Sequence, residues 1–202
     1  MKLFLASDGI PKEHEQELID LVGKKPTDIR VVFIPTAANP YPAKQTEYMN
    51  RAKRIFGHWG AQVDFLNLED YPDQPKELEE KLSSHDIIWV AGGNCYFLRY
   101  WTKKSGFDEI LPRLLEKGIV YAGESAASIN MGPSLKHYHK PDEPENGSEL
   151  IDKGLGYIDY VIIPHFNRPE SQHYYKDVEE KLQADGFKTK RLNDNEVVIT
   201  ND

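Results

Sequence analysis

The sequence predicts an α/β fold, with a doubly wound, mostly parallel sheet and helices on both of its faces. Short apolar segments rich in β-branched and aromatic residues recur along the chain, and longer segments that mix charged and apolar residues separate them. The apolar segments are almost continuously hydrophobic, which is typical of parallel strands that are covered on both faces. This alternation of strand-like and helix-like segments indicates a parallel α/β sheet.

Five segments are the expected parallel strands. They span residues 3–6, 31–34, 63–66, 87–90 and 119–122. A parallel connection needs a crossover of a dozen or more residues, which is usually a helix. We expect these helices over residues 13–22, 43–59, 75–83 and 108–117.

The remaining elements follow a less regular pattern. Residues 133–147 contain three prolines and several charges, so we expect a loop or a hairpin excursion there. Another strand is expected at 160–164 and a helix at 172–184. Residues 188–192 and 196–200 are expected to pair as a hairpin that turns at residues 193–195. The length of 202 residues predicts a single domain over 1–202.

Composition and charge disfavour several classes of function. The chain has 33 acidic and 25 basic residues and a net charge of −8, which disfavours binding to nucleic acids or to anionic membranes. Cys95 is the single cysteine, so an intrachain disulfide and a multi-cysteine zinc site are excluded. No apolar run is long enough for a signal peptide or a transmembrane helix. We therefore expect a cytoplasmic protein.

The sharpest local motif is Gly123-Glu-Ser125-Ala-Ala127, which lies where the fifth expected strand ends and a helix over 125–131 begins. A nucleophile elbow holds its serine on such a strand-to-helix turn, with small residues two positions before and after it. The helix N-terminus and the next backbone N–H can then stabilise an oxyanion. The alternative interpretation is that Ser125 only caps the helix.

A second motif, Gly92-Gly93-Asn94, directly follows the fourth expected strand and precedes an apolar helical segment. Ligands bind at the carboxyl ends of the strands in open α/β sheets, so glycines at this place can offer N–H donors to a developing negative charge. A tight turn in which Asn94 caps the following helix is the alternative.

His165 follows the expected strand at 160–164 and is therefore also placed at the carboxyl edge. A serine hydrolase needs an imidazole within hydrogen-bonding reach of the hydroxyl to remove its proton. His137 and His139 form a short pair, but no carboxylate or third histidine stands at a recognisable metal-ligand spacing. No metal site is predicted.

The three motifs Gly92-Gly93-Asn94, Gly123-x-Ser125-Ala126 and Pro164-His165-Phe166 occur in the order and at roughly the spacing of the dipeptidase E and cyanophycinase family of serine peptidases. The chain resembles that family from about residue 30 to residue 200. The resemblance implies a flavodoxin-like sheet related to class I glutamine amidotransferases. It also implies that Ser125 is the nucleophile, that His165 is its base, and that Gly92, Gly93 and the Ala126 amide form the oxyanion hole, with Asn94 placed to bind substrate.

Two positions depart from the family pattern. The family has glycine where this chain has Ala127, so a methyl group stands where the family packs its helix closely. The third triad member of the family is an aspartate that lies between the nucleophile and the histidine, with proline two positions later. The resemblance implies Asp142 for this role, and Glu143 is an alternative by counting back from His165.

The expected function is hydrolysis of small peptides through an acyl-enzyme, by an exopeptidase or dipeptidase without a cofactor. Arg168 is expected either to bind a carboxylate of the peptide substrate or to be a surface residue neutralised by Glu170. The alternatives are a cyanophycinase-like hydrolase of an aspartate-arginine polymer and a flavodoxin-like protein that only binds a ligand. A flavin or nucleotide protein is disfavoured because the segment 7–11 lacks the glycine-rich pattern of such proteins.

Overall fold

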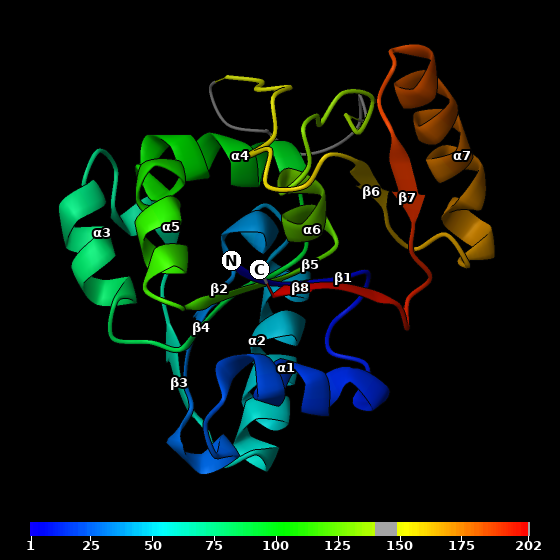
Figure 1. Cartoon of the computed structure of the whole chain (residues 1–202). Coiled ribbons are helices and arrows are strands. Elements are labelled where there is room, and N and C mark those ends of the chain that lie inside the picture. The colour runs from blue at the N-terminus through cyan, green and yellow to red at the C-terminus, as the bar shows by residue number, and fades with distance from the viewer. Residues whose placement is uncertain (140–148, 202) are drawn as a thin grey trace.

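The computed structural model describes residues 1–139 and 149–201, and a six-stranded sheet lies at its centre (Figure 1). Five strands run parallel, and β8 runs antiparallel to β1 at one edge. The order across the sheet is β3 (Gln62–Phe65), β2 (Arg30–Ile34), β4 (Ile87–Val90), β5 (Val120–Glu124), β1 (Lys2–Ala6) and β8 (Val197–Asn201). The predicted α/β fold with a mostly parallel sheet is confirmed.

Helices cover both faces of this sheet (Figure 1). One face carries α1 (Glu15–Val22) and α2 (Pro42–His58), and the other carries α3 (Pro75–Leu82), α4 (Cys95–Lys104), α5 (Phe107–Glu116) and α6 (Ala126–Asn130). Successive residues of a strand point to opposite faces. In β1, Leu3 and Leu5 pack on the α3–α6 side, whereas Phe4 and Ala6 pack on the α1–α2 side. All four side chains are completely buried, which explains the continuous apolar segments.

A second, two-stranded sheet lies beside the first and consists of β6 (Val161–Ile163) and β7 (Thr189–Arg191), which run parallel. The connection between them contains α7 (Pro169–Ala184). Buried residues of β6 and of α7 belong to the same apolar core as α3–α6, so the core continues from one sheet into the other. The strand expected at 160–164 is present, but it pairs outside the main sheet.

The predicted hairpin of residues 188–192 and 196–200 is wrong. β7 pairs with β6 in the small sheet, whereas β8 pairs with β1 in the main sheet, where Phe4 lies opposite Ile199. The polar segment 193–195 is therefore a crossing between two sheets and no hairpin turn. β7 is formed by Thr189, Lys190 and Arg191 and offers β8 no apolar face, while the edge of β1 offers a complete strand of hydrogen-bonding groups.

The carboxyl ends of β1, β4 and β5 lie next to one another. Ala6 is paired with Glu124, and Val90 with Gly123. The backbone N–H of His165, just after β6, donates to Ser7 Oγ just after β1 over 2.8 Å. The segments that follow four strands thus meet at one edge, where ligands bind in open α/β sheets.

Candidate active site

Ser125 lies on a sharp turn between β5 and α6. Its φ of 50° and ψ of −110° are in a region that is strained for residues other than glycine. The turn is fixed because Ser125 N–H donates to the Ala6 carbonyl at 3.0 Å and the Ser125 carbonyl accepts from Ile129 N–H at 2.9 Å. This is the strained strand-to-helix geometry of a nucleophile elbow.

The methyl group of Ala127 fits beside this turn because position 123 is a glycine. A Cβ atom at Gly123 would lie 2.9 Å from Ala127 Cβ, which is closer than two side chains approach. Ala127 is completely buried and occupies that space. The departure from the family pattern is therefore accommodated by close packing between the start of the helix and the end of the strand.

A line of hydrogen bonds joins Ser125, His165 and Asp194. The Ser125 Oγ to His165 Nε2 distance is 2.9 Å, and the distance from His165 Nδ1 to Asp194 Oδ1 is 2.6 Å. With Nδ1 protonated and bonded to the carboxylate, Nε2 is free to accept the serine proton. The arrangement can therefore activate a hydroxyl group and stabilise the imidazolium that results.

Burial and neighbouring charges set the protonation of this pair. Burial lowers the pKa of His165 below its ordinary value, and the nearby charge of Arg168 lowers it further, while the contact with Asp194 opposes both. Burial raises the pKa of Asp194, but hydrogen bonds from Arg168 and His165 outweigh it and hold that pKa below its ordinary value. At neutral pH, His165 is thus a neutral base and Asp194 is an ionised carboxylate.

The Gly92-Gly93 turn lies directly against this serine. A Cβ atom at Gly92 would lie 3.1 Å from Ser125 Cβ. Gly93 has φ +145°, and a Cβ there would lie 2.1 Å from the Ala37 carbonyl oxygen, so no other residue fits this position without a backbone shift. The two glycines let the backbone approach the hydroxyl closely.

Asn94 and Ala126 stand at the N-termini of two helices beside Ser125. Asn94 Oδ1 accepts hydrogen bonds from the backbone N–H groups of Tyr96 and Phe97, each at 3.0 Å, and so caps α4. Its side chain is buried, which corresponds to the capping alternative for this residue. Ala126 is the first residue of α6, and an N–H at this place has no acceptor within its helix.

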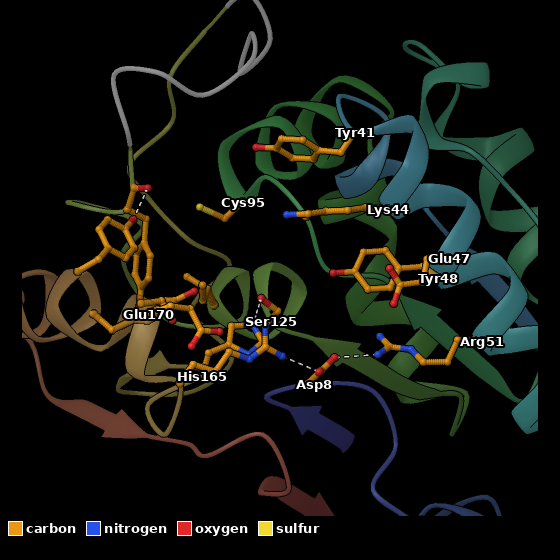
Figure 2. Close-up of a pocket in the computed structure, with 17 residues that line it drawn as sticks. Asp8, Tyr41, Lys44, Glu47, Tyr48, Arg51, Cys95, Ser125, His165 and Glu170 are labelled. Carbon is orange, nitrogen blue, oxygen red and sulfur yellow. Dashed lines mark hydrogen bonds and ion pairs between the residues drawn. The ribbon is translucent and has the colours of Figure 1, made fainter.

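Ser125, His165 and Gly93 line a cavity of about 370 Å³ (Figure 2). Ser125 and His165 lie on one side of it, while side chains of α2, among them Lys44, Tyr48 and Arg51, line the opposite side. The first turns of α7 and Tyr138 complete the wall. Cys95, which is 7% exposed, also borders the cavity.

The sequence model of peptidase family S51 matches residues 3–202. The chain belongs to peptidase family S51. One relative of this serine peptidase is an uncharacterized peptidase of Listeria innocua, which is 28% identical over 94% of this chain and 86% of its own length. Another is peptidase E of Streptomyces coelicolor, which is 27% identical over 84% of this chain and 65% of its own length.

The fold of the peptidase also occurs in solved structures. A putative peptidase E protein from Listeria monocytogenes EGD-e has a TM-score of 0.78 and 22% identity, over 98% of this chain and 97% of that one. A peptidase from an acI-B1 actinobacterium has a TM-score of 0.60 and 21% identity, over 88% of this chain and 74% of that one. The resemblance to the dipeptidase E family, within the class I glutamine amidotransferase-like fold, is thus confirmed.

The carboxylate next to His165 is one that sequence analysis missed. Asp142 and Glu143, the two candidates for this role, lie outside the described residues. Asp194 instead reaches the imidazole from the crossing between β7 and β8, where its N–H donates to Asn167 Oδ1 at 3.0 Å. The sequence predicts a hairpin turn at residues 193–195, and in a turn their polar side chains carry no functional signal.

Arg168 is held by carboxylates of the peptidase itself. Its Nε donates to Asp194 Oδ2 and its Nη2 to Asp8 Oδ2, each over 2.6 Å. Neither contact involves Glu170, the residue that the sequence suggests as an alternative partner for the charge of Arg168. Arg168 borders the cavity, and its predicted contact with a substrate carboxylate stays a prediction.

The described residues include no group of three or more histidine, cysteine, aspartate or glutamate side chains that could hold a metal ion. His137 contacts Asp185 at 3.2 Å, and the His139 and Tyr96 rings pack in a T-shaped arrangement. No helix within residues 1–139 and 149–201 has the length and apolar character that crossing a lipid bilayer requires.

Proposed function

We propose that the peptidase hydrolyses short peptides through an acyl-enzyme, with Ser125 as nucleophile, His165 as general base and acid, and Asp194 as the carboxylate that orients His165. The observation that carries the proposal is the continuous line of hydrogen bonds from Ser125 Oγ to Asp194, at 2.9 and 2.6 Å, at the wall of a cavity.

In the proposed mechanism, Ser125 Oγ attacks the scissile carbonyl carbon while its proton passes to His165 Nε2. The backbone N–H groups of Gly93 and Ala126 bind the oxyanion of the tetrahedral intermediate, with Gly92 allowing the close approach. His165 then protonates the leaving amine, and the peptide bond breaks. A water molecule, deprotonated by His165, hydrolyses the acyl-enzyme.

The size and charge of the cavity support short substrates. Its volume of about 370 Å³ is near the lower end of the roughly 300–1,000 Å³ of small-molecule pockets. Lys44 and Glu47 from α2 and Glu170 from α7 border it. A short peptide carries an ammonium and a carboxylate group close together, which these side chains can bind. The proposal is therefore an exopeptidase or dipeptidase.

A covalent serine probe tests the nucleophile. A fluorophosphonate is expected to label Ser125, as located by peptide mass spectrometry, and Ser125→Ala is expected to abolish the label. Ser171→Ala is the control, because Ser171 also borders the cavity but its hydroxyl oxygen is buried, and this variant should label normally. Labelling that persists in Ser125→Ala would refute the assignment.

A substrate screen tests the size class. We expect turnover of dipeptides and tripeptides with free termini, and much slower turnover of the same peptides after N-acetylation or C-amidation. Efficient cleavage of long blocked peptides would contradict the exopeptidase proposal. Turnover of an aspartate-arginine polymer in place of short peptides would instead favour a cyanophycinase-like activity.

A further inference from the structure

Three consecutive residues after β1 contact three separate parts of the site. Ser7, which is completely buried, accepts a hydrogen bond from the His165 backbone N–H at 2.8 Å. Gly9 N–H donates to Glu124 Oε2, also at 2.8 Å. Asp8 lies between them and borders the cavity (Figure 2). The end of β1 thus reaches both the residue that carries the imidazole and the residue before Ser125.

Asp8 bridges two arginines. Its Oδ1 accepts from Arg51 Nη1 at 2.8 Å, and its Oδ2 accepts from Arg168 Nη2 at 2.6 Å. The Asp8 side chain is 29% exposed, so these hydrogen bonds between charged groups are only partly screened by water. One carboxylate therefore holds in place two guanidinium groups that would otherwise repel each other.

Each arginine leads to a different side of Ser125. Arg168 also donates to Asp194, which in turn bonds His165. Arg51 also forms an ion pair with Glu124, which directly precedes Ser125 in the sequence. Contacts that begin at Asp8 therefore lead along one branch to the imidazole and along the other to the strand end that carries the hydroxyl.

The Glu124 branch is closely packed. Glu124 is 2% exposed, and Trp89 Nε1 donates to its Oε1 at 3.4 Å. Gly9 has φ +62°, and a Cβ atom there would lie 3.2 Å from Arg51 Cζ, so the glycine lets the loop lie closely on the guanidinium. A buried carboxylate requires a compensating partner. Arg51 is that partner for Glu124, and Asp8 accepts a hydrogen bond from the same guanidinium group.

We propose that Asp8 is a positioning residue of the active site: by binding Arg168 and Arg51 together, it keeps Asp194 and His165 aligned with Ser125. This inference rests on the proposed function of that triad. Asp8 acts through the arginines and touches none of the reacting atoms, so its loss should lower kcat and leave KM nearly unchanged.

The test compares Asp8→Asn with Asp108→Asn. Asp108 is the matched control because it forms a similar aspartate–arginine pair, with Arg99 at 2.9 Å and 21% side-chain exposure, on an element that does not border the cavity. We expect Asp8→Asn to lower kcat about tenfold, the effect of losing one hydrogen bond between charged groups, with KM within about twofold of wild type. Asp108→Asn should leave both constants unchanged.

A double-mutant cycle tests whether Asp8 acts through Arg168. In an Arg168→Gln background, Asp8→Asn should lower kcat by less than about twofold, because the link from Asp8 through Arg168 to Asp194 is already missing and only the contact with Arg51 remains to be lost. Arg51→Lys tests the other branch without removing the charge, and a smaller decrease in kcat is expected. An unchanged kcat in Asp8→Asn, a raised KM with normal kcat, or full additivity with Arg168→Gln would each overturn the proposal.

A second readout does not depend on turnover. The proton on His165 Nδ1, which is hydrogen-bonded to Asp194, should give a downfield NMR signal that His165→Gln removes. We expect this signal to be sharp in wild type and in Asp108→Asn, and broadened or lost in Asp8→Asn. If the wild type is inactive on every peptide, the proposed function fails whatever this signal does. If the wild type is active and the signal is unchanged in Asp8→Asn, the positioning role alone fails.

Discussion

Residues 1–131 and the described residues after 131 contribute to the same cavity in different ways. In the first part, strands alternate with helices, and Ser125 and the Gly92-Gly93 turn stand at strand ends where a parallel sheet regularly binds ligands. In the second part, His165 follows a strand of a separate small sheet, and Asp194 lies on the crossing between two sheets. A regular scaffold thus presents the hydroxyl, and an irregular addition supplies the imidazole and its carboxylate.

The largest expected effect tests whether the two parts act as one unit. Ser125→Ala and His165→Ala should each lower kcat by at least about 10⁴-fold, and the double variant should be no slower than either single variant, because triad members act together. Steady-state kinetics on the best short peptide measures this. A double variant much slower than both single variants would mean that the two parts contribute independently.

A smaller effect compares one glycine from each part. Gly93→Ala places a Cβ 2.1 Å from the Ala37 carbonyl oxygen, and Gly154→Ala places one 2.1 Å from the Gly132 carbonyl oxygen. We expect losses in the free energy of unfolding of about 3 and 2 kcal/mol, the first being larger because Gly93 also has positive φ.

Urea unfolding measures both losses, and activity separates the two sites. At a temperature where both variants remain folded, only Gly93→Ala should lower kcat, because it moves a backbone N–H beside Ser125. Equal loss of kcat in the two variants would show that general loosening of the fold, and no local change at the turn, is responsible.

The smallest expected effect concerns pH. In the proposed mechanism the active form needs neutral His165, so we expect kcat/KM to fall as the pH drops through the pKa of that group. Burial and the charge of Arg168 lower this pKa, so the acidic limb of the pH profile of kcat/KM should lie below the ordinary histidine pKa of about 6.5. Arg168→Gln removes a positive charge and should move the limb to higher pH. A limb that stays in place, or moves to lower pH, would contradict the charge pairing described for Arg168.

The regular part of the fold could be predicted closely from sequence. The expected strand at 87–90 is β4 itself, and the expected helix at 75–83 differs from α3 by one residue. Burial on both faces makes the strands continuously apolar, and this local pattern is independent of which strands pair. The strand-to-helix turn at Ser125 could be predicted for the same reason, because a strand, small residues and a helix follow one another there within a few positions.

The irregular part could be predicted only in pieces. The sequence predicts the strand near residue 162 but not its pairing. Its partner β7 is a polar segment much later in the chain, with Thr189 opposite Val161. Asp194 reaches His165 only because β7 and β8 pair with different sheets and the chain between them passes His165. No spacing or residue type in the sequence encodes that contact.

The most direct test of the account is a comparison of Asp194→Asn with Asp142→Asn in one assay. If the carboxylate from the crossing between the two sheets orients His165, Asp194→Asn should lower kcat by about 10⁴-fold with little change in KM, as loss of the correct imidazole tautomer does in serine proteases. Asp142→Asn should stay within about threefold of wild type, since the described structure already fills the position next to Nδ1. A mild effect at Asp194 together with a severe one at Asp142 would contradict the proposed triad.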